Sequence, residues 1–321
     1  MNLKSVEEIQ PNIRVILRMD LDIPEGDNSR LLKSVPTIRY LIEKGCKLAI
    51  IGHRGRPKGR EEKFSLRPVY VELMGILGEM DSIFLDDFEI IEDKPLIFFE
   101  NLRFWEGEET NDNTFMKKLI DASQAYVNDA FAVAHRTHAS IMLHTVLDTY
   151  YGFSFLEEAE KISKLLENPE RPLTIVLGGA KEDKLSYLPE LVNIADRILL
   201  GGKLPKMINY QNEKVIVGKL SESGLDLSEE TIKQFIELIS SSKTLVWAGS
   251  MGFYEDAGSR AGTEAVAQAI ANTVGYKIIA GGDTSASIKN LGLKDKIDFI
   301  CSGGGVLLEF LTKKTLPAWN N

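Results

Sequence analysis

Residues 126–138 place an apolar run directly before two histidines and an arginine, at His135, Arg136 and His138. An apolar run that gives way to polar and small residues is typical of a buried strand that ends in a loop. Ligands of α/β proteins bind outside the carboxyl ends of strands. In a chain with a formal net charge of −9, cationic and hydrogen-bonding groups at such a point indicate a pocket for a small anion.

Three earlier apolar runs end in the same way. Their polar residues are Arg18, Asp20, Asp22 and Arg30 after the first run, His53, Arg54, Arg56, Lys58 and Arg60 after the second, and Arg103 after the third. Like charges repel each other, so such clustering is unfavourable unless an anion offsets it, and arginine binds carboxylates and phosphates in a bidentate manner. We therefore expect these side chains to meet at one edge of a parallel sheet.

Other interpretations of these residues are open at this level. Two carboxylates two positions apart, Asp20 and Asp22, could form an acid–base pair, a Mg²⁺ site or a polar strand edge. The basic run from residue 53 to residue 60 could be a solvated loop. His53, His135 and His138 could bind zinc, although no cysteine or well-spaced carboxylate completes a coordination set.

Five apolar runs in the second half end in glycine turns. The turns are Gly178-Gly179, Gly201-Gly202, Gly249, Gly281-Gly282 and Gly303-Gly304-Gly305. Glycine lets the backbone approach a ligand closely, and the helix that follows offers a positive N-terminus to phosphate. Lys181 could hold a terminal phosphate and Asp283 a Mg²⁺ ion. The turns contain neither a Walker A motif nor a dinucleotide G-x-G-x-x-G motif, but together they predict a phosphate cradle for a nucleotide.

Length and composition indicate a globular protein of two domains. The chain has 321 residues, of which 44% are hydrophobic and 26% charged, and single cores stop growing near roughly 250–300 residues. No apolar run approaches the ~20 residues of a membrane span, and no signal peptide is visible. The net negative charge argues against nucleic acid as the main partner. Cys46 and Cys301 lie in apolar runs, so we expect buried free thiols and a cytoplasmic protein.

Short apolar runs alternate with helical patterns along the chain. The candidate strands are Ile13–Leu17, Lys47–Ile51, Pro95–Phe99, Tyr126–Asn128, Leu173–Leu177, Arg197–Leu200, Lys214–Val217, Thr244–Trp247, Tyr276–Ala280 and Ile297–Cys301. Helices are expected over Leu31–Lys44, Leu66–Leu77 and Glu229–Ile239, the last after a Ser228 cap. The alternation predicts an α/β fold with two doubly wound, parallel-sheet, Rossmann-like domains.

The boundary between the two domains is expected at residues 155–171. Leu156–Leu166 has the pattern of an amphipathic helix, and Pro169 and Pro172 end it. This helix would be a hinge between residues 1–154 and residues 172–306. An ordinary surface helix within one domain fits the same pattern equally well.

Long motifs of the chain resemble those of the phosphoglycerate kinase family, from about Arg14 to Trp319. The matching segments are Arg18–Pro24 (RVDFNVP in the family), His53–Pro57 (HLGRP), Glu100–Phe104 (ENLRF), Tyr126–His138 (YVNDAFGTAHRAH), Gly178–Lys184 (GGAKVxDK), Val246–Glu255 (VWNGPMGVFE), Ala280–Thr284 (GGGDT) and Ser302–Leu311 (TGGGxxLEFL). The resemblance implies a glycolytic and gluconeogenic kinase. It would transfer a phosphoryl group reversibly between 1,3-bisphosphoglycerate and Mg-ADP, giving 3-phosphoglycerate and Mg-ATP.

The resemblance also implies roles for individual residues. The residues that would bind 3-phosphoglycerate are Asp20, Asp22, Arg30, His53, Arg56, Arg103 and Arg136. Those that would bind ATP or ADP are Gly178, Gly179, Lys181, Lys184, Gly201, Gly202, Glu255, Gly281, Gly282, Asp283 and Thr284, with Asp283 as the Mg²⁺ ligand. The groups that would neutralise the transferred phosphoryl group, in an in-line transfer after domain closure, are Arg30, Lys181, Gly304 and Gly305. The tail, about Leu307–Asn321, would pack back on the first domain.

The chain departs from the family pattern at several points. Lys181 and Lys184 are three positions apart where the family has four, and Asp22 replaces an asparagine. The segment Gly201–Thr244, which in the family helps to form the nucleobase pocket, is several dozen residues shorter. These departures motivate two rival hypotheses: a nucleotide-binding or regulatory relative without turnover, and a kinase with another donor nucleotide or acyl phosphate. We expect the protein to be a monomer.

Overall fold

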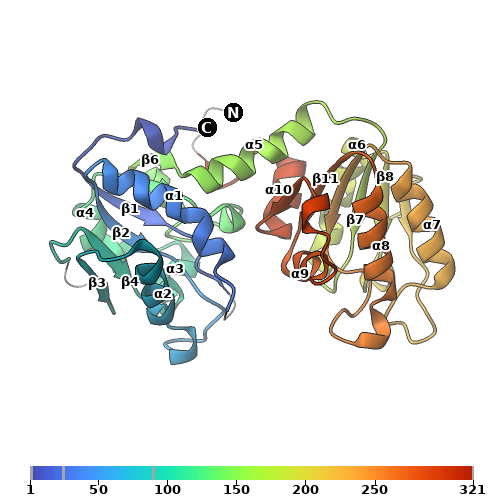
Figure 1. Ribbon diagram of the computed structural model, residues 1–321, viewed down its shortest axis with the longest axis horizontal. Helices are drawn as coiled ribbons and strands as arrows, with labels where there is room; N and C mark the ends of the chain where they lie inside the picture. The colour runs from blue at the N-terminus through green and yellow to red at the C-terminus, as the bar shows by residue number, and fades with distance from the viewer. Residues whose placement is uncertain (1–2, 24–25, 89–90, 320–321) are drawn as a thin grey trace. The chain divides into compact units, whose positions relative to one another are not determined.

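The structure is a computed structural model that describes residues 3–23, 26–88 and 91–319. The chain folds into two compact units, each built around its own sheet (Figure 1). Unit 1 consists of Met1–Ala159 and Thr315–Asn321, and unit 2 of Glu160–Lys314. The helix α5 (Phe153–Glu167) begins in unit 1 and ends in unit 2.

Unit 1 contains a six-stranded parallel sheet of order β3-β4-β2-β1-β5-β6. Its strands are β1 (Arg14–Arg18), β2 (Lys47–Ile51), β3 (Ser82–Leu85), β4 (Leu96–Phe99), β5 (Ala125–Asn128) and β6 (Asp148–Tyr151). Its helices are α1 (Ser29–Glu43), α2 (Arg67–Leu77), α3 (Glu106–Thr110) and α4 (Lys117–Asp121). Short 3₁₀ turns are η1 (Val6–Glu8), η2 (Glu62–Phe64), η3 (Leu102–Phe104), η4 (Asn113–Met116), η5 (Phe131–Val133) and η6 (Met142–Thr145).

The side chains of the central strand β1 are buried on both faces of the unit 1 sheet. Val15 and Leu17 pack into the core on one face, whereas Ile16 packs into the core on the other. Successive side chains of a strand point to opposite faces, so a continuous apolar run is the pattern of a strand covered on both sides. The register places Arg18 beside Ile51 of β2 and Asn128 of β5, so these three strands end at one edge.

Unit 2 contains a second six-stranded parallel sheet, of order β12-β11-β10-β7-β8-β9. Its strands are β7 (Leu173–Leu177), β8 (Arg197–Leu200), β9 (Val215–Val217), β10 (Thr244–Ala248), β11 (Tyr276–Ala280) and β12 (Phe299–Cys301). Its helices are α6 (Leu188–Ile194), α7 (Glu229–Ser240), α8 (Ala261–Asn272), α9 (Gly282–Asn290) and α10 (Gly304–Lys313). The 3₁₀ turns are η7 (Glu182–Tyr187), η8 (Leu204–Lys206), η9 (Ala257–Ser259) and η10 (Lys294–Lys296).

Each sheet has a point at which the direction of strand addition reverses. In unit 2, β8 and β9 follow β7 on one side, and β10 then returns to its other side. In unit 1, β2 lies on one side of β1, and β5 returns to the other. Ligands of doubly wound sheets bind outside the carboxyl ends of strands at such switch points. The topology therefore directs attention to the residues after β1 and β5, and after β7 and β10.

The predicted α/β class with two doubly wound parallel sheets is confirmed, and each of the ten candidate strands overlaps an observed one. Two strands, β3 and β6, were not predicted. Both lie at the edges of the unit 1 sheet, and neither is a continuous apolar run: β3 has one buried residue, Phe84, and β6 begins with the polar residues Asp148 and Thr149. Ser228 caps α7 as expected, because its hydroxyl accepts a hydrogen bond from the N–H of Thr231 at 3.3 Å.

The observed division of the chain differs in detail from the expected domains. It falls between Ala159 and Glu160, within α5. The expected tail of unit 1 began at about Leu307, but residues 307–314 belong to unit 2. The reason is that α10 buries Val306, Leu307, Phe310 and other apolar residues, so the chain returns to unit 1 only at Thr315.

Among the described residues, no helix combines the length and apolar character that crossing a membrane requires. Cys46 and Cys301 are both buried and outside any disulfide, as expected.

Candidate functional site

Arg18 and His53 form the buried centre of the unit 1 site. Arg18 ends β1 and is fully buried, and His53 follows β2 with only 3% of its surface exposed. The Arg18 guanidinium donates from Nη2 to Nδ1 of His53 at 2.9 Å and from Nη1 to the carbonyl of Met19 at 2.5 Å. Burial, with the nearby charges of Arg18 and Arg103, holds the pKa of His53 well below its usual value. His53 is therefore a neutral imidazole at physiological pH.

Arg30 lies in the first turn of α1 and is oriented by two acidic residues. Its Nη1 donates to Oδ2 of Asp20 at 3.1 Å and to the carbonyl oxygen of Asp22 at 3.1 Å. Asp20 is 8% exposed, and burial raises its pKa although Arg30 and Arg18 oppose that shift. Asp22 instead accepts the N–H of Gly55 at 2.8 Å, so its carboxylate joins the loop after β1 to the loop after β2. The Asp20 carboxylate therefore positions Arg30, and the Asp22 carboxylate positions the backbone of Gly55.

Three further predicted arginines surround this centre. Arg103 lies in the turn after β4, donates to the carbonyl of Gly55, and has its Nε 3.2 Å from Oε1 of Glu109. Burial lowers the pKa of Arg103, and the charges of Arg18 and Arg56 act in the same direction. Arg56 and Arg136 are exposed. The charges of Arg103, Arg18 and Arg136 also reinforce the effect of burial in lowering the pKa of His138 to about 4, so the predicted cations do gather at one edge of the sheet.

Glu100 and Asn101 hold the loops that carry these cations, and neither was among the predicted site residues. Oε1 of Glu100 accepts the N–H groups of Leu66 and Asn101, each at 2.7 Å. The amide of Asn101 donates to the carbonyl of Arg54 at 2.7 Å, and its oxygen accepts the N–H of Arg103 at 3.1 Å. A buried Glu-Asn pair directly after an apolar strand was the available signal, because a carboxylate there needs several donors.

Glu108 and Ser140 are a second pair that the sequence did not single out. Both are fully buried, and Oε1 of Glu108 accepts the hydroxyl hydrogen of Ser140 at 2.6 Å. Nδ1 of His138 lies 3.7 Å from the same carboxylate oxygen. Glu108 belongs to the exposed-looking run Glu106–Glu109, so its burial could not be read from composition.

In unit 2, four of the predicted glycine amides are already used by the backbone. Gly178 N–H donates to the carbonyl of Ala248 at 3.1 Å, and Gly179 N–H to that of Ser250 at 2.7 Å. Gly201 N–H donates to the carbonyl of Leu177 and Gly202 N–H to that of Met251, both at 2.9 Å. These four N–H groups therefore hold the carboxyl ends of β7, β8 and β10 together. Their glycines allow close approach of the chain: a Cβ at Gly202 would lie 2.5 Å from the nitrogen of Gly179.

The side chains of Lys184 and Thr284 connect the segments that follow β7 and β10 at the switch point of unit 2. Nζ of Lys184 donates to the carbonyl of Gly178 at 2.7 Å and to that of Ala248 at 3.1 Å, and so joins the ends of β7 and β10. Burial lowers the pKa of Lys184 to about 8. The Thr284 hydroxyl accepts the N–H of Gly249 at 2.8 Å, which joins β10 to α9. Both side chains are therefore bound to protein groups.

The helix starts of α9 and α10 are the parts of unit 2 best suited to hold phosphate. Gly282, Asp283 and Thr284 form the first turn of α9, and Gly304 and Gly305 begin α10. The first N–H groups of a helix have no carbonyl partner within that helix, and the helix dipole is positive there. Asp283 and Lys181 are exposed, and the charges of both act on Lys184. These predicted residues therefore share one region.

Glu255 is exposed in the turn after β10, and the neighbouring Asp226 is a residue that the sequence analysis missed. Asp226 is buried and accepts the N–H groups of Leu227 at 2.8 Å and of Gly262 at 3.0 Å. It thereby fixes the start of α8. The N–H of Phe253 donates to the carbonyl of Leu225 at 2.8 Å, so the 224–227 segment lies beside the turn after β10.

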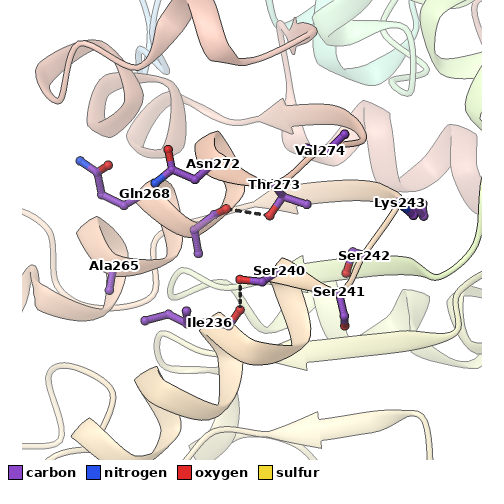
Figure 2. A pocket seen from close by; sticks show the side chains of 11 residues that line it. Ile236, Ser240, Ser241, Ser242, Lys243, Ala265, Gln268, Asn272, Thr273 and Val274 are labelled. Atoms are coloured by element: carbon purple, nitrogen blue, oxygen red, sulfur yellow. Dashed lines mark hydrogen bonds between the residues drawn. The ribbon is translucent and has the colours of Figure 1, made fainter.

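A groove of about 550 Å³ lies away from these residues, between the carboxyl ends of α7 and α8 (Figure 2). Ser240, Asn272 and Thr273 line it, and Thr273 donates its hydroxyl hydrogen to the carbonyl of Ala269. Because β10 and β11 begin at this edge, the groove is at the opposite end of the sheet from the glycine turns. It is not part of the candidate site.

Within the described part of the chain, no three His, Cys, Asp or Glu side chains are grouped closely enough to hold a metal ion. The zinc alternative is disfavoured on a second ground: Nδ1 of His53 is occupied by a guanidinium, and arginine charges surround His53 and His138. Asp283 fits a different kind of site, because Mg²⁺ bound to a nucleotide needs only one or two protein carboxylates beside the phosphates.

Comparison with known proteins extends over almost the whole chain. A sequence model of the phosphoglycerate kinase family matches residues 7–223 and 206–314. The phosphoglycerate kinase of Finegoldia magna is 34% identical over 388 aligned positions, covering 99% of this chain and 98% of that protein. The phosphoglycerate kinase of Dictyoglomus turgidum is 34% identical over 95% of this chain and 94% of that protein.

Solved structures give the same result. The phosphoglycerate kinase of Coxiella burnetii has a TM-score of 0.79 and 28% identity, covering 99% of this chain and 98% of that chain. The enzyme of Pyrococcus horikoshii has a TM-score of 0.82 and 25% identity, covering 98% of this chain and 97% of that chain.

The comparisons also support the shortened segment of unit 2. The 388 positions aligned with the Finegoldia protein exceed the 321 residues of this chain, so that protein has at least 67 residues (388 less 321) that this chain lacks. The two stretches matched by the family model overlap at residues 206–223, within the segment Gly201–Thr244 that was expected to be short. The resemblance found in the sequence is thus confirmed, and the chain belongs to the phosphoglycerate kinase family.

Proposed function

We propose that this glycolytic kinase binds 3-phosphoglycerate in unit 1, through Arg30, His53, Arg56, Arg103 and Arg136. The observation that carries the proposal is the gathering of Arg18, Arg103 and Arg136 around a buried, neutral His53, with Arg56 acting on Arg103, in a chain of net charge −9. A small ligand with a carboxylate and a phosphate supplies the negative charge that such a cluster lacks. Asp20 and Asp22 act on this site by holding Arg30 and Gly55.

Unit 2 is proposed to bind Mg-ATP or Mg-ADP at the helix starts of α9 and α10. The amides of Gly282, Gly304 and Gly305 and the charge of Lys181 suit phosphate oxygens. Asp283 would hold Mg²⁺, whose role is to offset charge on the phosphates. Lys184 would act differently from the original expectation, because its nitrogen joins two carbonyls of the glycine turns. Glu255 is proposed to contact the ribose.

The reaction itself demands little covalent chemistry from the protein. A carboxylate is already a nucleophile, so transfer depends on alignment of the two ligands and on neutralising the charge of the moving group. Arg30 and Lys181 are proposed to supply that neutralisation. Since their half-sites belong to different units, we propose that the units approach each other during turnover and exclude water. A monomer is proposed as the working form, in the reducing cytoplasm that two buried free thiols suit.

The experiment that tests this assignment is a coupled assay with 3-phosphoglycerate and several Mg-nucleotides. Turnover with Mg-ATP that stops on chelation and returns with added Mg²⁺ is expected. Turnover only with another nucleotide or another acyl phosphate would favour a relative with changed specificity. Nucleotide binding without turnover on any of them would favour a regulatory relative and contradict the proposal.

A further inference from the structure

Four buried polar side chains form one continuous hydrogen-bonded chain in unit 1. Oε1 of Glu108 accepts the hydroxyl hydrogen of Ser140 at 2.6 Å, and Oε2 accepts the N–H of Ser140 at 3.0 Å. The Ser140 hydroxyl accepts Nε–H of Arg18 at 3.0 Å, and Nη2 of Arg18 donates to Nδ1 of His53 at 2.9 Å. Glu108, Ser140 and Arg18 are 0% exposed, and His53 is 3% exposed.

Each link of this chain fixes the direction of the next. A carboxylate only accepts hydrogen bonds, so the single hydroxyl hydrogen of Ser140 goes to Glu108 and a lone pair remains for Arg18. A guanidinium only donates, so Nδ1 of His53 must be an acceptor without a hydrogen. A neutral imidazole with an unprotonated Nδ1 carries its hydrogen on Nε2.

The surrounding charges support the same state of the ring. The groups that act on His53 are Arg18, Arg103, His138 and Arg136, all of which disfavour an added proton. Glu108 is the buried carboxylate hydrogen-bonded into the chain, and its accepting oxygens make the burial of the Arg18 guanidinium tolerable. The hydrogen-bonded chain is therefore directional from Glu108 to His53.

We propose that Glu108 is a positioning residue for the substrate site, which acts through Ser140 and Arg18 to hold the His53 ring with its hydrogen on Nε2. The inference deepens the proposed function, since His53 is one of the groups assigned to 3-phosphoglycerate. Its consequence is that His53 offers the substrate a neutral Nε2–H donor in one fixed orientation. A donor held in this way binds an anion without the loss of freedom that a mobile side chain incurs.

The first test needs no catalytic readout, and it uses the wild-type protein except for the assignment of one signal. Nitrogen-15 NMR of the histidine side chains distinguishes the two neutral tautomers and the protonated ring, and the His53 signal is identified by its loss in His53→Gln. The wild-type protein is expected to show His53 with its hydrogen on Nε2 from pH 6 to pH 8. A hydrogen on Nδ1, or a protonated ring in this range, would overturn the proposal even if the enzyme were fully active.

The second test uses variants of residues in the hydrogen-bonded chain from Glu108 to His53. Ser140→Ala and Glu108→Gln are expected to mix the His53 tautomers and to raise KM for 3-phosphoglycerate on the order of tenfold to hundredfold, with KM for the nucleotide unchanged. Glu106→Gln, on the exposed side of the same helix α3, is the matched control and should match wild type. Folded variants with a wild-type His53 spectrum and a wild-type KM would contradict the role of Glu108. If Glu108→Gln does not fold, Ser140→Ala and the wild-type spectrum still decide the question.

Discussion

The two units reach their candidate sites by different means. Unit 1 presents long cationic side chains that buried acidic and amide groups hold in place, as Asp20 holds Arg30 and Asn101 holds the loop of Arg54. Unit 2 contributes mainly backbone groups, from glycine turns packed against one another and from the starts of α9 and α10, which have no side-chain cap. A side-chain site should fail when a charge is removed, whereas a backbone site should fail when a side chain is added.

The largest effect is expected from Arg30→Ala in unit 1. Electrostatic donors aimed at developing charge are worth about 10²–10³ in rate, or about 3–4 kcal/mol, so kcat should fall by that factor. The change also leaves the buried carboxylate of Asp20 without its 3.1 Å partner, so thermal stability should fall as well.

Steady-state kinetics and the melting temperature measure both effects of Arg30→Ala. Arg39→Ala is the control, because Arg39 is exposed on the same helix α1. An Arg30→Ala protein that kept more than half of the wild-type kcat would remove Arg30 from the catalytic assignment.

Lys184→Met tests the lysine that joins the carboxyl ends of β7 and β10 in unit 2. The pKa of Lys184 is about 8 in the folded protein and 10.5 for the free side chain, with burial as the main cause. Between these values the unfolded chain binds more protons, so the Lys184 contribution to the free energy of unfolding rises with pH, by up to roughly 3 kcal/mol.

Urea unfolding of wild type and Lys184→Met from pH 7 to pH 10.5 measures this slope. The stability difference in favour of wild type should grow across that range, whereas the exposed Lys203→Met should run parallel to wild type. Parallel curves for wild type and Lys184→Met would mean that Lys184 keeps its ordinary pKa.

Gly202→Ala tests the backbone character of unit 2 more directly. Gly202 has a φ of +62°, and an added Cβ would lie 2.5 Å and 2.6 Å from backbone atoms of Gly179 and 2.9 Å from the carbonyl of Ser250. A residue with a side chain in this conformation is strained, and we expect a loss of about 1–3 kcal/mol in the free energy of unfolding.

The matched control is Gly282→Ala, because no atom lies within 4 Å of its added Cβ. Its free energy of unfolding should stay within about 0.5 kcal/mol of wild type. Equal stability of the two variants would show that the glycine turns of β7 and β8 are not packed as described.

The sequence predicted the strands and cations well because both depend on local pattern. Ile16 and its neighbours form an apolar run whose carboxyl end is marked by Arg18, and this rule located the edge of each sheet at which the carboxyl ends of the strands lie. It could not predict how each polar atom is used. The amide of Gly179 could have faced a ligand or Ser250, and only the packing of two turns against each other decides for Ser250.

Glu108 illustrates the same limit in unit 1. It lies in an acidic run whose pattern is typical of a solvated surface, yet it is fully buried against Ser140, 32 positions later in the chain. Burial of a charge in this way depends on a partner that is distant in sequence. Local periodicity contains no information about such a partner.

The smallest expected effect concerns the nucleobase, because the segment Gly201–Thr244 of unit 2 is expected to be shorter than in the family. If affinity comes mainly from phosphates, Mg²⁺ and the ribose contact of Glu255, then ATP and GTP share almost every contact. We expect their kcat/KM values to lie within about tenfold of each other, or roughly 1.4 kcal/mol.

Lys181→Ala should lower both values by the same factor, because its proposed partner is a phosphate that both nucleotides carry. Kinetics with each nucleotide on wild type and on Lys181→Ala make the measurement. A preference for ATP beyond a hundredfold would mean that side chains of unit 2 recognise the edge of adenine, and that backbone alone does not define this half of the enzyme.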